Sequence, residues 1–139
     1  MGAHNMADRA VGKTMNEAYD RAVSYAQGEY GNNAYNGTIS TTEGFNDKTE
    51  ELEKLLTRKR EGSVKFTVNV GNGFGFKQID KHFKDMTEDE WHKQCVNDWE
   101  EEAWDNTDKW GEVWGAKTNK VMENSTEKNL YLFAGWAAE

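Results

Sequence analysis

The segment from Thr87 to Trp114 holds the side chains best suited to chemistry or to binding. It contains five of the six tryptophans and ten acidic residues against two lysines. Thr87 and Glu90 form a T-x-x-E pattern, which predicts a helix start because each side chain can satisfy the other residue's free N–H group. An apolar face is expected along the positions that recur every four residues, which are Trp91, Cys95, Trp99 and Ala103.

The opposite face of this helix is acidic and carries a tryptophan that a core does not obviously need. Most charge runs are solvated surface, and that is one interpretation of this face. The other interpretation is a partner-binding surface, with Trp104 as the desolvated anchor, since tryptophan is enriched among interface hot spots. The residues predicted to contact a partner are Glu90, Asp98, Glu101, Trp104, Asp105 and Asp108.

The charge of the chain is concentrated in its second part. Residues 1–85 hold 12 acidic and 12 basic side chains, whereas residues 86–139 hold 13 acidic and 5 basic ones, so the net charge of −8 arises there. A nonspecific nucleic-acid binder needs the reverse, because its affinity comes from lysine and arginine. The sequence therefore argues against direct nucleic-acid binding and predicts a protein partner with a basic surface.

No motif names a catalytic or cofactor chemistry. His92 and Cys95 have the spacing of half a zinc site, but a structural site needs four ligands and Cys95 is the only cysteine. A cysteine on a buried apolar stripe has a raised pKa and is a poor nucleophile. The glycines from Gly71 to Gly75 lack the spacing of a phosphate-binding loop. We therefore expect no enzyme activity, no metal and no cofactor.

A polar segment, Tyr35 to Thr42, suits a strand because it is rich in β-branched threonine. Its hydroxyl groups have two interpretations. They face water on a half-exposed strand, or they line a pocket for a small ligand such as a nucleotide signal. The residues of that alternative site are Tyr35, Asn36, Thr38 and Ser40.

Periodicity elsewhere predicts the remaining elements. A first helix begins after Thr14 and ends near Gly31, and a second covers about Lys48 to Arg60, its basic end suiting the helix dipole. Ser63 to Val70 alternates as a strand with one buried face, and Asn72-Gly73 predicts a tight hairpin. A strand over residues 112–118, a loop over 119–129 and an apolar strand over 130–138 complete the chain. The predicted class is α+β, with three helices packed on a mixed or mainly antiparallel sheet of about four to five strands.

The length of 139 residues suits one domain, predicted over residues 6–139. Residues 1–5 read as a vector remnant, with Met6 as the natural start. The chain has neither a signal-peptide pattern nor an apolar run long enough to span a membrane. A cytoplasmic protein without membrane contact is therefore expected.

Two segments resemble a group of small uncharacterised bacteriophage proteins. They are YNGTISTTEGF at Tyr35 to Phe45 and FAGWAAE at Phe133 to Glu139. The resemblance implies a small acidic protein made in an infected bacterial cell, where many such proteins act on host machinery, including defence nucleases and CRISPR complexes. The resulting hypothesis is a non-enzymatic inhibitor that binds a host protein in the cytoplasm through the acidic, tryptophan-containing helix.

Overall fold

Strand β6, Thr126–Ala138, lies inside a mixed four-stranded sheet in the computed structural model, which describes residues 3–31, 37–71, 73 and 75–138. Its antiparallel neighbours are β1, Ala3–Gly12, and β5, Val113–Glu123. The short strand β2, Phe45–Asp47, runs parallel to β5 at the far edge. With the three α-helices and six strands of the described residues, the predicted α+β class is confirmed.

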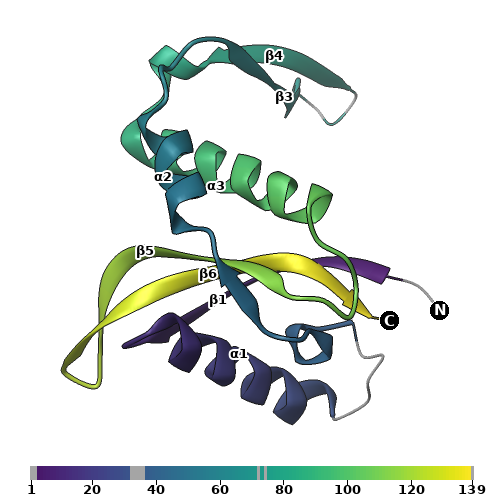
Figure 1. Cartoon of the computed structure of the whole chain (residues 1–139). Helices are drawn as coiled ribbons and strands as arrows, with labels where there is room; N and C mark the ends of the chain where they lie inside the picture. The colour runs from purple at the N-terminus through teal and green to yellow at the C-terminus, as the bar shows by residue number, and fades with distance from the viewer. Residues whose placement is uncertain (1–2, 32–36, 72, 74, 139) are drawn as a thin grey trace.

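Helices cover both faces of this sheet (Figure 1). Helix α1, Met15–Tyr30, lies on one face, whereas α2, Thr49–Thr57, and α3, Glu88–Asp105, lie on the other. Alternation along β6 supplies both cores, because Phe133 belongs to the buried cluster under α1 and Leu132 to the cluster under α3.

The first helix begins and ends where the sequence predicts. The Thr14 side chain caps it by accepting a hydrogen bond from the Glu17 N–H at 3.1 Å. Gly31 ends it at a φ of +83°, a backbone conformation that glycine adopts without strain. Met15, Ala18, Tyr19 and Ala26 recur at helical spacing along α1 and are buried.

The predicted loop over residues 119–129 is wrong. Strand β5 continues to Glu123, and β6 begins at Thr126 after a turn at Asn124 and Ser125, whose φ angles are both positive. The polar side chains misled the prediction because this end of the hairpin projects from the sheet, where both strand faces are wet.

Strand β1 was not predicted, because its sequence carries few β-branched or aromatic residues. Only Met6 and Gly12 in it are buried. The strand is held by pairing along its full length with β6, from Ala3 opposite Ala138 to Gly12 opposite Asn129. Ala3 to Asn5, within the predicted remnant, thus form the first part of a strand of the sheet.

The strand expected over residues 35–42 is also wrong where the structure describes it. Residues 39–41 form a 3₁₀ helix that Thr38 caps by accepting a hydrogen bond from the Ser40 N–H. Threonine hydroxyls bonded to the local backbone compete with strand pairing, and those of Thr41 and Thr42 donate to carbonyls three residues back.

The predicted hairpin is confirmed, but its buried face is not. Strands β3, Ser63–Asn69, and β4, Phe76–His82, pair antiparallel, with Gly71 and Gly73 at positive φ in the turn. Asn72 lies outside the described residues. Phe66 and Val70, expected to be buried, are 42% and 48% exposed. The physical reason is that β3 and β4 form a separate two-stranded sheet that lies over α3 and not within the main sheet (Figure 1).

Within the described part of the chain, none of the helices combines the length and the apolar character that crossing a membrane requires.

Candidate functional site

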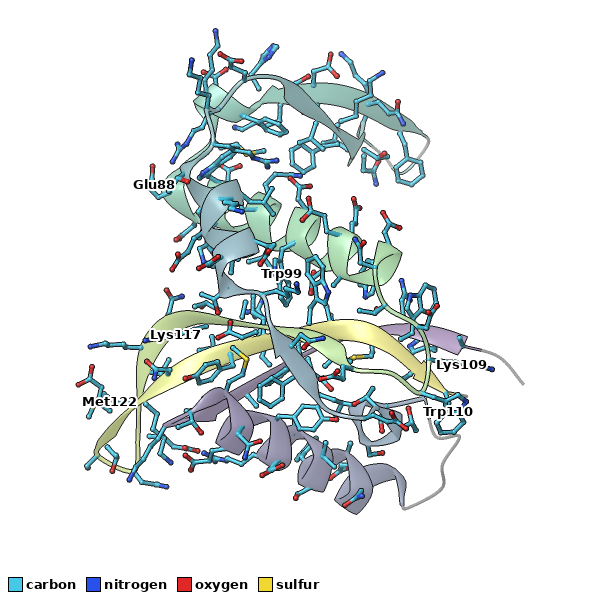
Figure 2. The ribbon with its side chains drawn as sticks, viewed as in Figure 1. Glu88, Trp99, Lys109, Trp110, Lys117 and Met122 are labelled. Carbon is cyan, nitrogen blue, oxygen red and sulfur yellow. The ribbon has the colours of Figure 1, made fainter. Side chains whose placement is uncertain are left out.

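Helix α3 turns its buried stripe to the sheet, which fixes the side chains that stay outside. The expected apolar face is confirmed, because its four residues, Trp91, Cys95, Trp99 and Ala103, are buried. The labelled Trp99 points from α3 toward the sheet (Figure 2), where its indole N–H donates to the Lys48 carbonyl at 3.1 Å. The predicted capping box of Thr87 and Glu90 is also present.

Two arginines just after α2 form ion pairs with acids of α3. Arg58 forms an ion pair with Asp98, and Arg60 forms one with Glu88 at 2.6 Å. Both guanidinium groups also lie over the Trp91 ring, at 4.9 and 5.1 Å from its centroid. The basic cluster was predicted to stabilise its own helix end, but α2 ends at Thr57 and these two arginines bind α3 instead.

Two acids among the six predicted partner-binding residues have polar partners within the molecule. Glu90 accepts the Thr87 N–H, which lowers the pKa of the Glu90 carboxyl, and lies 3.8 Å from the Lys81 ammonium group of the hairpin. Asp98 accepts a hydrogen bond from the Gln94 amide at 3.0 Å besides its ion pair with Arg58. These carboxylates therefore attach α3 to the hairpin and to the end of α2.

Trp104 was predicted to point away from the core, and this prediction is wrong. Its side chain is half-buried, and its indole N–H donates to the Met6 carbonyl of β1 at 3.0 Å. The Trp136 indole N–H in turn donates to the Trp104 carbonyl at 2.7 Å. The reason for the error is that β1, absent from the predicted fold, supplies the surface on which Trp104 packs.

The remaining three predicted residues, Glu101, Asp105 and Asp108, are exposed, as is Glu102 between them. Glu101 and Asp105 stand four residues apart on α3, a spacing at which like charges repel. The last turn of α3 has no basic residue, so these acids also face the negative end of the helix dipole. We call these four side chains the acidic end of α3. Repulsion among Glu101, Glu102 and Asp105 destabilises the end of α3, and Asp108 lies just beyond the helix.

The hairpin holds an apolar face over α3, which the alternation in the sequence predicted but as a buried face. Val64 packs against the α2–α3 core, and alternation puts Phe66, Val68 and Val70 on the same face. Ile79 stands opposite Phe66 in the register and is 41% exposed. We call Phe66, Val68, Val70 and Ile79 the hairpin face. The sequence of β4 did indicate that this face is exposed. Lys77 and Lys81 flank Ile79 at the two-residue spacing, so two lysines share its face of the strand.

The alternative ligand-binding residues have separate outcomes. Tyr35 and Asn36 lie outside the described residues. The hydroxyls of Thr38 and Ser40 lie 2.8 Å apart, which places both within the cap of the 3₁₀ helix. Thr38 also lines one end of a cleft between β1 and α1.

Cys95, one member of the His92–Cys95 pair, lies inside the core. The Cys95 thiol is buried and donates to the Leu55 carbonyl at 3.4 Å, and this burial raises its pKa. Among the described residues, no group of three or more histidine, cysteine or acidic side chains is placed to hold a metal ion.

An ion-pair cluster closes the other end of the cleft between β1 and α1. Glu123 accepts two hydrogen bonds from Arg21, both at 2.7 Å, and one from Lys128 at 2.9 Å. These hydrogen bonds lower the pKa of the Glu123 carboxyl to about 2. Arg21 also donates to the Val11 carbonyl, which ties α1 to β1 and to the projecting β5–β6 hairpin.

We expect Glu123 to make stability sensitive to acid. Its folded-state pKa lies below the ordinary value of 4.5, so its contribution is complete above about pH 4.5 and is lost as the pH falls toward 2. Glu123→Gln should therefore lower the melting temperature at neutral pH, and the difference from the unsubstituted protein should shrink over that pH range. Thermal unfolding across a pH series measures this. Glu127→Gln, which removes an exposed ion pair to Lys120, is the matched control. A difference that stays constant with pH would contradict the assignment.

Comparisons of this chain with protein-family models, with curated proteins and with solved structures found no match.

Proposed function

We propose that this chain is a non-enzymatic protein that binds a basic surface of another protein through two neighbouring regions, the acidic end of α3 and the hairpin face. The single observation that carries the proposal is their position: half-exposed apolar side chains lie over a helix whose exposed acids have no compensating base in its last turn. Exposed apolar side chains beside a cluster of exposed acids are typical of protein interaction sites.

Electrostatics supports a basic partner. Glu88, Glu90 and Asp98 already have cationic partners, whereas Glu101, Glu102 and Asp105, at the end of α3, form no ion pair with another described residue. There, repulsion between neighbouring acids and the helix dipole both disfavour the folded chain. Lysine or arginine from a partner would relieve both effects. The complementary fields would also speed encounter, because long-range attraction steers association.

The hairpin face supports a contact that is more than electrostatic. Phe66 and Ile79 form a cross-strand pair with both side chains more than 40% exposed. Burying such side chains against a partner stabilises the complex, since transfer of apolar surface out of water is favourable. We infer that Phe66, and not Trp104, is the aromatic anchor, because the Trp104 indole is already bonded to β1.

The proposal extends to the kind of protein that is bound. A host protein whose basic surface normally holds nucleic acid is the target that fits the charge of α3 best, and the protein would then act as an inhibitor by occupying that surface. The bacteriophage setting comes from the resemblance of residues 35–45 and 133–139 alone. The alternative function, sequestration of a small nucleotide-like ligand, is favoured by Thr38, which lines the cleft between β1 and α1.

The binding proposal is tested by capture from bacterial lysate at low and high salt, followed by binding kinetics with the captured protein. Reversing Glu101 and Asp105 to lysine should slow association and flatten its salt dependence, because exposed charges act mainly on encounter. Phe66→Ala should instead speed dissociation and weaken binding by about 2 kcal/mol, as expected for a desolvated anchor.

Matched controls separate this site from general effects of charge and shape. Glu53→Lys changes an exposed acid on α2, and Phe76→Ala truncates an aromatic residue on the opposite face of the hairpin. Both should leave the kinetics unchanged. Capture that does not depend on salt, or equal binding by all variants, contradicts the proposal. A melting temperature raised by nucleotides would favour the small-ligand alternative.

A further inference from the structure

Strand β1 leaves one long edge of the sheet open. It spans ten residues and pairs with β6 on one side, and no strand in the described part of the chain pairs with its other side. Long open edges are uncommon because their free N–H and C=O groups attract another strand. Here the edge carries neither a proline nor a bulge in its register with β6, although Asp8 and Arg9 are charged and Arg21 donates to the Val11 carbonyl.

A cleft of about 710 Å³ runs beside this edge. One wall is formed by eight successive residues of β1, from His4 to Val11, and the other by α1 residues that include Ala22, Tyr25 and Ala26. Tyr25 is 71% exposed, so its ring is available to a ligand in the cleft. Gly37 and Thr38 line the cleft as well, as do Arg21 and Glu123, which bind each other. A site that follows eight strand residues suits an extended chain better than a rounded small molecule.

The charge inside the cleft points to the sign of its ligand. Arg21 is neutralised by its two hydrogen bonds to Glu123. The Asp8 side chain forms no hydrogen bond or ion pair with another described residue, and alternation places it on the α1 side of β1 with Met6 and Ala10. The Asp8 side chain is exposed in the cleft, and its partial burial there raises the pKa of its carboxyl. A lysine or arginine in the cleft would give the Asp8 carboxylate an ion-pair partner.

We propose that an extended segment of a partner protein adds to the open edge of β1 as a fifth strand, beside α1, with a lysine or arginine opposite Asp8. Main-chain hydrogen bonds to β1 would give affinity, and the cross-strand pair with Asp8 would give specificity. This surface lies on the α1 face of the sheet, opposite to the face that α3 covers, and the inference does not rest on the binding function proposed above.

A library of random eight-residue peptides displayed on yeast tests this proposal without knowledge of the partner. Selection on the full chain should enrich peptides with alternating β-branched residues and one lysine or arginine at a fixed position. Selection on Asp8→Lys should enrich aspartate or glutamate at that position instead. Asp20→Lys, on an exposed part of α1 that does not line the cleft, is the control and should select the same peptides as the unsubstituted protein.

The best selected peptide is then synthesised and titrated into the isotope-labelled protein. Shifts and slowed hydrogen exchange at the amides of residues 3–12 support strand addition. Replacing the basic residue by glutamine should weaken binding about fivefold, the upper range for a partly exposed ion pair. Every second peptide N–H would donate to β1, and the others would point away from it. Methylating the first set of nitrogens should abolish binding, because it removes main-chain donors, whereas methylating the second set should not. If Asp8→Lys does not express, Asp8→Asn replaces it in the selection.

Three results would overturn the proposal. The first is a selection without a basic position. The second is peptide binding that leaves the β1 amides unchanged. The third is a concentration-dependent dimer of the protein that protects β1 without peptide, which would assign the edge to a second copy of the chain.

Discussion

Trp99→Ala is expected to lower the free energy of unfolding by about 3–5 kcal/mol, the range for truncation of a large buried aromatic residue. The Trp99 side chain is 0% exposed, in the cluster between α3 and the sheet. Its ring lies 6.1 Å from that of Trp114, and its N–H is bonded to the Lys48 carbonyl. Truncation would remove these contacts and leave a cavity that α2, α3 and the sheet all border.

Urea denaturation measures this effect. If the slope of the transition is the same for the variants, a shift of its midpoint reports a change in stability. Phe76→Ala is the matched control, because Phe76 is an aromatic residue that is 76% exposed, and its truncation should change stability by less than about 0.5 kcal/mol. Trp99→Phe should fall between the two, since it retains most apolar contacts and loses the N–H group. Loss of less than about 1 kcal/mol in Trp99→Ala would show that α3 is not packed as described.

Gly135→Ala is expected to cost about 1–3 kcal/mol, although it adds a single methyl group. Gly135 lies in β6, a central strand of the sheet. A Cβ atom there would stand 2.6 Å from Val113 Cγ1 and 3.0 Å from Val113 Cβ. Both residues are buried, so neither strand can move aside without disturbing the core under α1. The substitution should therefore strain the β5–β6 pairing.

A double-mutant cycle with Val113→Ala identifies the cause of that strain. Removing the Val113 methyl groups should relieve part of it, so the double variant should lose less stability than the two single variants added together, by about 0.5–3 kcal/mol. Gly28→Ala is the control: it lies in α1 with no atom within 4 Å of the added Cβ, and it should be neutral or stabilise by up to about 1 kcal/mol. Simple additivity in the cycle would show that Val113 is not the contact.

Local patterns in the sequence were sufficient for much of the fold. The capping residues Thr14 and Thr87 set the starts of α1 and α3, because a cap acts on backbone groups within three residues. The four-residue spacing from Trp91 to Ala103 identified the buried side of α3, and alternation in β3 with glycine in the turn identified the hairpin. From these elements alone the α+β class could be predicted.

The candidate site was only partly predictable. Glu101, Asp105 and Asp108 are exposed as expected, because an acid on the outer face of an amphipathic helix stays in water unless a partner reaches it. Whether such a partner exists is not a local property. Asp98 meets Arg58, which lies 40 residues away, and Trp104 meets Met6, which lies 98 residues away.

The sequence by itself determined where helices begin, which of their faces are apolar and where the excess negative charge lies, because these depend on neighbours within a few positions. Tertiary structure alone decided that residues 3–12 form an edge strand, that Arg58 and Arg60 pair with Asp98 and Glu88 of α3, and that the hairpin lies apart from the main sheet. The physical reason is that strand pairing and ion pairing join residues distant in the chain, and the free energy of such contacts depends on which surfaces the folded chain brings together.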